Sequence, residues 1–189
     1  WPRDAVFITK AMDILKMGKE TEKFYKVFCR KTQSKNGMWE QRFYTDCKLA
    51  PAWGYQVDET ASVIYGVYEH YLVTKNEKFL KDTLPMCEKA ISFLKHYVKD
   101  WLDLDAEEIL NKDKVKEEME EQLRKNCKER KIHVSYDLWE MCEGIHLYSL
   151  ATIYSAFATI LKIYKVLGKN VSDFDNNRLK EEKVQKNEK

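Results

Sequence analysis

Two short stretches, one at the N-terminus and one near the C-terminal third of the sequence, hold side chains that could act on a sugar. Residues 136–140 read Tyr-Asp-Leu-Trp-Glu, and the chain opens with Trp-Pro-Arg-Asp. Cleavage of a glycosidic bond needs a carboxylic acid that protonates the leaving oxygen, and apolar neighbours help that acid to keep its proton. Glu140 lies between Trp139 and Met141, so it is a candidate general acid. The alternative interpretation is an acidic residue placed at a helix N-terminus, where the macrodipole favours negative charge.

Four further positions have side chains suited to holding a sugar. Arg3 and Asp4 place a fork of donors next to a carboxylate acceptor, which suits adjacent hydroxyl groups. Trp53 could present its ring to the apolar face of a pyranose. Asp58 stands at the predicted start of a helix, where it could bind substrate or cap the helix.

The spacing of apolar residues predicts an all-α chain in which loops carry these side chains. Helical periodicity is found near residues 7–15, 24–28, 57–73, 77–102 and 145–167. Gly18 is predicted to stop the first helix and Gly168 to close the last one at its C-cap. Pro85 predicts a kink or a break in its helix. Residues 34–54 break the pattern and are predicted to form an ordered loop.

Two segments differ from the helices in composition. Residues 105–131 are mainly charged, with a thin apolar stripe, and predict a solvated helical arm inserted between two core helices. An arm that docks a protein partner is the alternative. Residues 168–189 end in a lysine-glutamate run and predict a polar tail or connector. The first domain is therefore expected to cover residues 1–167.

Charge and cysteine content argue against several classes of protein. The net charge of +2 gives no electrostatic case for nucleic acid or an anionic membrane. The sequence contains no uninterrupted run of about 18 apolar residues, so it predicts no membrane-spanning helix. Five scattered cysteines without a C-x-x-C pair suggest neither zinc nor a disulfide framework, so we expect no metal, no cofactor and a cytoplasmic location. The chain begins with Trp inside a motif, which we interpret as a truncated start, and a signal peptide is not judged.

Four ordered blocks carry a family resemblance. They are residues 1–5 (Trp-Pro-Arg-Asp-Ala), 41–44 (Gln-Arg-Phe-Tyr), 49–60 and 135–140. These blocks resemble glycoside hydrolase family 15, which contains glucoamylases, glucodextranases and some trehalases. They occur in the order of that family, and with the helices between them they span positions 1 to about 165.

The resemblance implies a fold and a reaction. The fold would be an (α/α)6 barrel of the six-hairpin glycosidase type, of which this chain would hold the first half to two-thirds. The reaction would be inverting hydrolysis of α-glucosidic bonds at the non-reducing ends of an oligosaccharide or polysaccharide of α-linked glucose. Starch-type, dextran-type and trehalose specificity all remain open, as does the oligomeric state.

The resemblance also implies roles for seven residues. Glu140 matches the general acid. Substrate-binding roles are implied for Arg3, Asp4, Trp53, Asp58, Asp137 and Trp139. Of these, Arg3 and Asp4 match the pair that binds hydroxyls of the terminal sugar, and the match of Asp58 requires a gap.

Two departures from the family pattern change the expectation for this chain. Met141 stands where fungal members have a second glutamate. The inverting mechanism also needs a second carboxylate as base, about 6.5–9.5 Å from the acid, and no residue of this chain matches it. We therefore expect the chain alone to show little or no hydrolysis. The alternatives are a non-catalytic carbohydrate-binding remnant or pseudo-enzyme, and a helical scaffold for a protein partner.

Overall fold

The computed structural model describes residues 1–52, 54–102 and 135–170. Three predictions lie outside these residues. They are the stacking role of Trp53, the charged arm at 105–131 and nearly all of the tail at 168–189.

The described part of the chain is all-α, as predicted. Its helices are α1 (Pro2–Ile14), α2 (Gly18–Lys23), the π-helix η1 (Phe24–Cys29), α3 (Arg30–Thr32), α4 (Val57–Thr74), α5 (Glu77–Leu102) and α8 (Leu147–Leu167). Two short strands, β1 (Ser135–Tyr136) and β2 (Glu143–Gly144), pair antiparallel. Residues 34–52 form a loop with one isolated bridge, which confirms the loop prediction for that part of the segment.

The prediction that Gly18 stops the first helix is wrong. Helix α1 ends at Ile14, and Lys16 takes the left-handed conformation with φ 63°. The N–H of Met17 donates to the carbonyl of Met12, and the N–H of Lys16 donates to that of Asp13. This pattern is a Schellman motif, and it ends the helix before the glycine. Gly18 instead begins α2. At the other end of the chain Gly168 caps α8 with φ 64°, as predicted.

Pro85 does not break its helix. Helix α5 continues through the proline from Glu77 to Leu102. A proline inside a helix removes one hydrogen bond and costs about 3 kcal/mol. The neighbours Leu84, Met86 and Cys87 are all buried in the core, so tertiary packing offsets this local cost.

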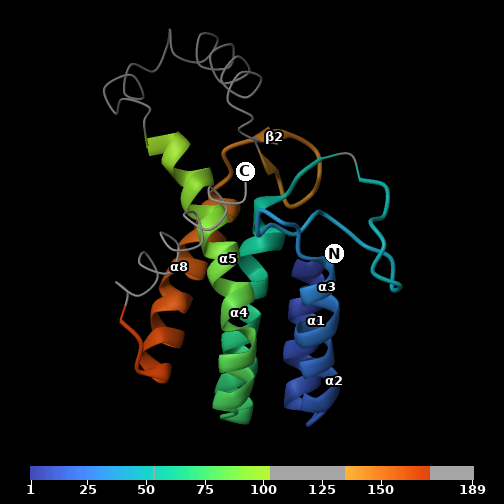
Figure 1. The fold of residues 1–189 in the computed structure, drawn as a ribbon. Coiled ribbons are helices and arrows are strands. Elements are labelled where there is room, and N and C mark those ends of the chain that lie inside the picture. Colours follow the sequence, from blue (N-terminus) through green and yellow to red (C-terminus); the bar gives the residue numbers. More distant parts are fainter. Residues whose placement is uncertain (53, 103–134, 171–189) are drawn as a thin grey trace, which may run out of the picture.

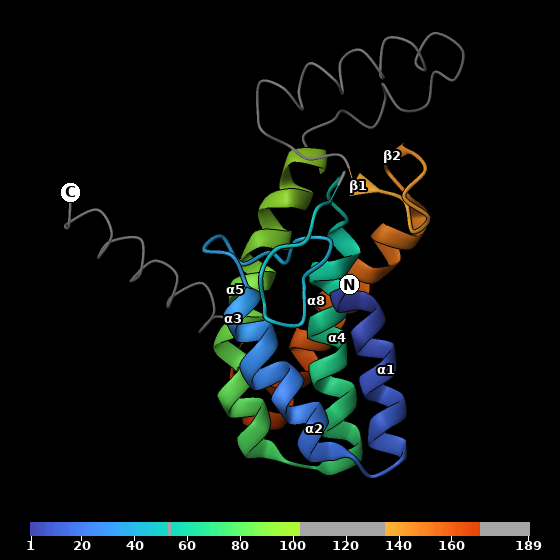
Figure 2. The same cartoon turned by 90° about the vertical axis from the view of Figure 1, so that its right-hand side faces the viewer.

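Three long helices begin at the same end of the molecule. Figures 1 and 2 show α1, α4 and α8 starting beside the loops and the β1–β2 hairpin, with α2 and α5 running back in the opposite direction. Helix α4 packs against both α1 and α8, and α5 packs against α4 and α8. The N-termini of three helices therefore face the loops that hold the predicted site residues.

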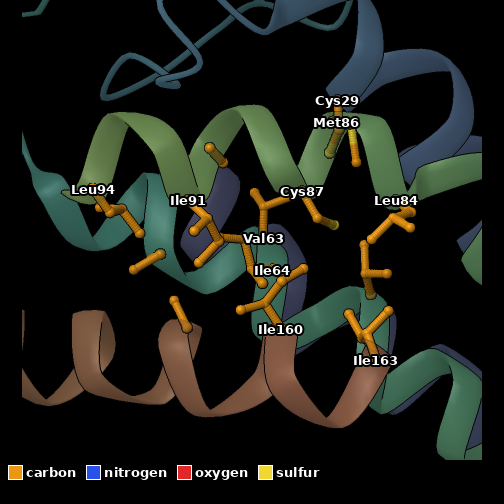
Figure 3. Close-up of a cluster of buried hydrophobic side chains, with 14 of the residues drawn as sticks. Cys29, Val63, Ile64, Leu84, Met86, Cys87, Ile91, Leu94, Ile160 and Ile163 are labelled. Carbon is orange, nitrogen blue, oxygen red and sulfur yellow. The ribbon is translucent and has the colours of Figure 1, made fainter. Parts of the chain in front are cut away.

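The hydrophobic core lies between α4, α5 and α8. Figure 3 shows Val63 and Ile64 of α4 next to Ile91 of α5 and Ile160 of α8. Each of these side chains is at most 5% exposed. Burial of a large aliphatic side chain contributes about 1.5–3 kcal/mol, so this cluster fixes α4 relative to its neighbours.

The four cysteines within the described residues are free thiols. They are Cys29, Cys47, Cys87 and Cys142. Cys29 and Cys87 lie in the core, where burial raises the pKa of both thiols.

Helix α8 is long and apolar enough, by length and composition, to cross a membrane. The stretch Leu147–Val166 meets this criterion, and 39% of it is buried within the molecule. Ile153, Ile160 and Ile163 pack in the core against the other helices. A core helix of a packed domain passes the same test, so the finding does not assign α8 to a membrane. The expectation of no membrane partner stays a prediction.

Gly66 lies where α4 packs tightly against Tyr25 and Val6. A Cβ at this position would lie 2.3 Å from Tyr25 Oη and 2.8 Å from Val6 Cγ1. Both side chains are buried, and the tyrosine hydroxyl is hydrogen-bonded to Thr9. Overpacking costs about 1–3 kcal/mol, which exceeds the roughly 1 kcal/mol that alanine gains over glycine in a helix. We expect Gly66→Ala to lower the free energy of unfolding, as measured by urea denaturation.

Gly18→Ala is the matched control, because its nearest neighbour atom would lie 3.6 Å away. We expect this control to leave the stability unchanged or slightly raised. Equal behaviour of the two variants would contradict the close packing inferred at Gly66.

Candidate functional site

Arg3 joins the start of α1 to the start of α4. Its backbone N–H donates to Glu59 Oε2 at 2.6 Å, and its Nη1 donates to Asp58 Oδ2 at 2.8 Å. Nη2 contacts Asp4 Oδ2 at 3.2 Å. The first N–H groups of a helix have no partner within the helix, and Pro2 has no N–H to satisfy. Glu59 therefore supplies the acceptor that α1 lacks at its first free N–H.

The two carboxylates from α4 are fully buried, whereas the one from α1 is exposed. The side chains of Asp58 and Glu59 are 0% exposed, and that of Asp4 is 57% exposed. Glu59 Oε1 lies 3.3 Å from Arg3 Nη1 without hydrogen-bond geometry, so the hydrogen bond of Glu59 to Arg3 is the one at the backbone N–H. Asp4 thus remains the member of the cluster that solvent or a ligand can reach.

Burial and charge act in opposite directions on this cluster. Burial raises the pKa of Glu59 to about 8 and also raises that of Asp58, while the positive charge of Arg3 opposes both shifts. Burial alone would lower the pKa of Arg3, but the charges of the two carboxylates outweigh it and raise that pKa. Near neutral pH Glu59 therefore keeps its proton, and Arg3 pairs with Asp58.

The candidate acid lies beside the N-terminal motif. Trp1 Nε1 donates to Glu140 Oε1 at 2.9 Å, across 139 positions of sequence. Glu140 is partly buried, and its backbone takes a left-handed conformation with φ 59°. The guanidinium of Arg42 lies over the ring of Trp1, 5.2 Å from its centroid. The structure therefore brings together the two motifs that the sequence singled out.

Asp137 organises the turn that presents Glu140. Its Oδ1 accepts hydrogen bonds from the N–H groups of Met141 and Cys142, at 2.7 and 3.1 Å. These bonds lower the pKa of Asp137. Its carbonyl accepts from the N–H of Glu140 and from Gln56 Nε2. One carboxylate oxygen of Asp137 is thus occupied by N–H groups of its own turn. A role of Asp137 in substrate binding stays a prediction.

Trp139 and Asp58 lie in opposite environments. Trp139 is 78% exposed and Met141 is 83% exposed, so the turn displays two large side chains to solvent. Asp58 has no exposed surface. Helix α4 begins after Gln56, whose side chain makes no capping hydrogen bond, and Ser135 Oγ accepts the N–H of Val57 instead. Asp58 lies in the first turn and is therefore not the N-cap residue. Its carboxylate contacts Arg3 instead, and direct contact with substrate stays a prediction.

Sequence reasoning assigned no role in the site to Trp1, Glu59 or Tyr148. Tyr148, in the first turn of α8, is partly buried, and its pKa is raised by burial and by the negative charge of Asp58. No local motif marks it, because it reaches the cluster only through packing of α8 on α4. Glu59 is recognisable in the sequence as an acid in the first turn of a helix. Its contact with Arg3, 56 positions away, is not.

Within the described ranges, no three His, Cys, Asp or Glu side chains are arranged to hold a metal ion. The chemistry available at this site comes from carboxyl groups, a guanidinium and indole rings. Together they provide several hydrogen-bond donors and acceptors for hydroxyl groups.

Comparisons with known proteins give a coarse relationship. The chain is 28% identical over 95 residues to an uncharacterized glycosyl hydrolase of Methanocaldococcus jannaschii. The match covers 50% of this chain and 15% of that relative, so the chain spans a small part of the relative's length. No family model matches the chain, and no solved structure matches it. The comparison supports a relationship to glycosyl hydrolases without giving a particular family.

Proposed function

We propose that this chain forms part of a family 15-like glycoside hydrolase that cleaves α-glucosidic bonds with Glu140 as the general acid. The observation that carries the proposal is the hydrogen bond from Trp1 Nε1 to Glu140 Oε1. It places the candidate acid next to the helix that begins with Arg3 and Asp4. A residue that gives a proton and residues that hold hydroxyl groups must lie close together for this chemistry.

In this proposal the two oxygens of Glu140 have different tasks. Oε1 accepts the indole N–H of Trp1, which leaves Oε2 to carry the proton. That proton passes to the glycosidic oxygen as the bond to the anomeric carbon breaks and the ring gains oxocarbenium character. A water molecule bonds to the anomeric carbon from the opposite face and gives its proton to a second carboxylate, which is not assigned among the described residues. Asp4 accepts hydroxyl protons of the terminal sugar, and the exposed ring of Trp139 is available to its apolar face.

The proposed fold is part of an (α/α)6 barrel. Helix α4 is covered on both sides by α1 and α8, whereas each of those two helices has an edge that no other described element covers. Exposed apolar residues line these edges: Phe7, Ile8, Ile14 and Leu15 on α1, and Leu147, Leu150, Tyr154 and Leu161 on α8. Further parallel helices packed on both edges would continue the layer into a barrel with the site at its mouth.

A non-catalytic carbohydrate-binding protein is the second candidate. It is favoured by one observation, that none of the carboxylates in the described ranges is matched to the base of an inverting mechanism. Arg3, Asp4 and Trp53 would then form a sugar pocket without turnover. The location in the cytoplasm stays a prediction under either proposal.

Binding of α-glucosides tests what the two candidates share. We expect the purified protein to bind methyl α-glucoside, maltose, isomaltose or trehalose in calorimetric titrations. Asp4→Asn is expected to weaken binding about 10–100-fold, because a hydrogen bond to a charged group contributes roughly 1.5–3 kcal/mol. Because the Asp4 side chain is 57% exposed, this substitution should leave the stability of the protein almost unchanged.

Glu20→Gln is the matched control, since Glu20 is exposed on α2 at the far end of α1. It should bind sugar as the wild type does. Failure of all four sugars to bind, or equal affinity of Asp4→Asn and the wild type, would contradict the proposal.

A further inference from the structure

We propose that Glu59 is a positioning residue, which holds Arg3 and through it orients the exposed Asp4 for binding sugar hydroxyls. This inference rests on the proposed function, because it concerns the same site. It gives a role to a residue that makes no contact with solvent.

The geometry fixes both ends of the Arg3 residue. One carboxyl group of Glu59 accepts the backbone N–H at 2.6 Å and lies 3.3 Å from Nη1 of the guanidinium. Glu59 itself lies in the first turn of α4, within a segment whose residues from Val57 to Ile64 are all buried. A side chain anchored in this way has little freedom, so it transmits the fixed position of α4 to Arg3. Nη2 is then directed at Asp4, at 3.2 Å.

Asp58 and Glu59 play different parts in the cluster. Asp58 Oδ2 receives a direct hydrogen bond from the guanidinium at 2.8 Å and is the charged partner. Glu59 binds the backbone as well as the side chain, and it keeps its proton near neutral pH. A buried guanidinium between two ionised carboxylates would leave one negative charge without compensation, which is costly in a dry interior.

The charged and titratable groups around Glu59 come from three helices. They are Arg3 and Asp4 of α1, Asp58 of α4 and Tyr148 of α8. Burial makes the largest contribution to the raised pKa of Glu59, and the charge of Asp58 adds to it. Ionisation of Glu59 above about pH 8 would therefore add a negative charge directly beside the Arg3 guanidinium.

Two substitutions separate positioning from charge. Glu59→Gln keeps the shape, stays neutral and retains an oxygen that can accept the Arg3 N–H. Glu59→Ala removes both contacts. We expect Glu59→Gln to bind methyl α-glucoside within about 3-fold of the wild type at pH 7, and Glu59→Ala to bind about 10-fold or more weakly, because Arg3 then loses the contact that fixes its position.

The Arg3 guanidinium signals in nitrogen-detected NMR give a readout independent of sugar. In the wild type they should be slowly exchanging and should shift with a midpoint near pH 8, the pKa of Glu59. Glu59→Gln should keep slow exchange and lose the pH shift, and Glu59→Ala should lose both. The urea unfolding midpoint of each variant shows whether it is folded.

The outcomes distinguish this inference from the proposed function. If no α-glucoside binds but the NMR titration behaves as described, the proposed function fails and the positioning of Arg3 stands. If a folded Glu59→Ala binds sugar as the wild type does, or Glu59→Gln retains the pH shift, the inference is wrong. Should Glu59→Ala fail to fold, the exchange rate of the Arg3 guanidinium in the folded wild type decides the question, because fast exchange would show that Arg3 is not held in place.

Discussion

Replacing Arg3 with alanine is expected to lower the free energy of unfolding by about 3–5 kcal/mol, the usual cost of removing one partner from a buried ion pair. The guanidinium is the positive charge that faces Asp58 and Glu59, both 0% exposed. Without it, these carboxyl groups must either remain charged in a dry interior or take up protons. Urea denaturation followed by circular dichroism measures the loss.

The loss from Arg3→Ala should grow with pH. Burial already raises the pKa of Glu59 to about 8 in the wild type, and removal of the opposing positive charge raises it further. The folded state then binds more protons than the unfolded state at neutral pH, so stability falls as pH rises. The destabilisation is expected to be smallest near pH 5, where protonated carboxyl groups are easily buried, and largest near pH 9.

Lys10→Met is the matched control on the same helix. Lys10 pairs with Glu69 at 2.6 Å, but the two side chains are 42% and 20% exposed. Ion pairs of this kind contribute about 0–1 kcal/mol, so the control should change stability little. If Arg3→Ala were as stable as Lys10→Met, the positive charge of Arg3 would not contribute to the stability of the buried cluster.

The elements were predictable where the sequence carries a local pattern. Helical periodicity gave α4 and α5 nearly to their ends, and Gly168 marked the end of α8. The end of α1 was not predictable, because a lysine at position 16 takes the left-handed conformation that normally favours glycine. The break predicted at Pro85 takes account only of the local cost of a proline in a helix, and the packing of α5 in the core outweighs that cost.

The site was predictable as a set of residues but not as a set of contacts. The motifs pointed to Arg3, Asp4 and Glu140, yet the partners of Arg3 lie 55 and 56 positions away. These contacts depend on how closely α1 approaches α4, which a buried glycine permits and no sequence spacing encodes. Asp137 carried a local signal that was missed, since aspartate often accepts N–H groups of its own turn.

Glu140→Gln is expected to reduce hydrolysis of maltose about 10²–10⁴-fold in any preparation that cleaves it, the usual contribution of a general acid. Glutamine keeps the shape and can still accept the N–H of Trp1, but it cannot give a proton to the leaving oxygen. The same variant should lose far less activity on 4-nitrophenyl α-glucoside, because nitrophenolate leaves without protonation. The ratio of kcat/KM for the two substrates is the measurement.

Glu143→Gln is the matched control, because Glu143 is an exposed glutamate three positions further along the same hairpin. It should leave both rates unchanged. The chain alone is expected to release little or no glucose, since no base is assigned among the residues that the structure describes. Glucose release by the chain alone that Glu140→Gln abolishes would contradict this expectation.

The comparison of leaving groups separates two roles that Glu140 could play. A residue that only binds sugar contributes equally to both substrates, because each presents the same glucose unit to the site. A residue that donates the proton matters most when the leaving oxygen is strongly basic, as it is in maltose. An equal loss on maltose and on 4-nitrophenyl α-glucoside would therefore make Glu140 a binding residue, and the acid of this site would have to be sought elsewhere.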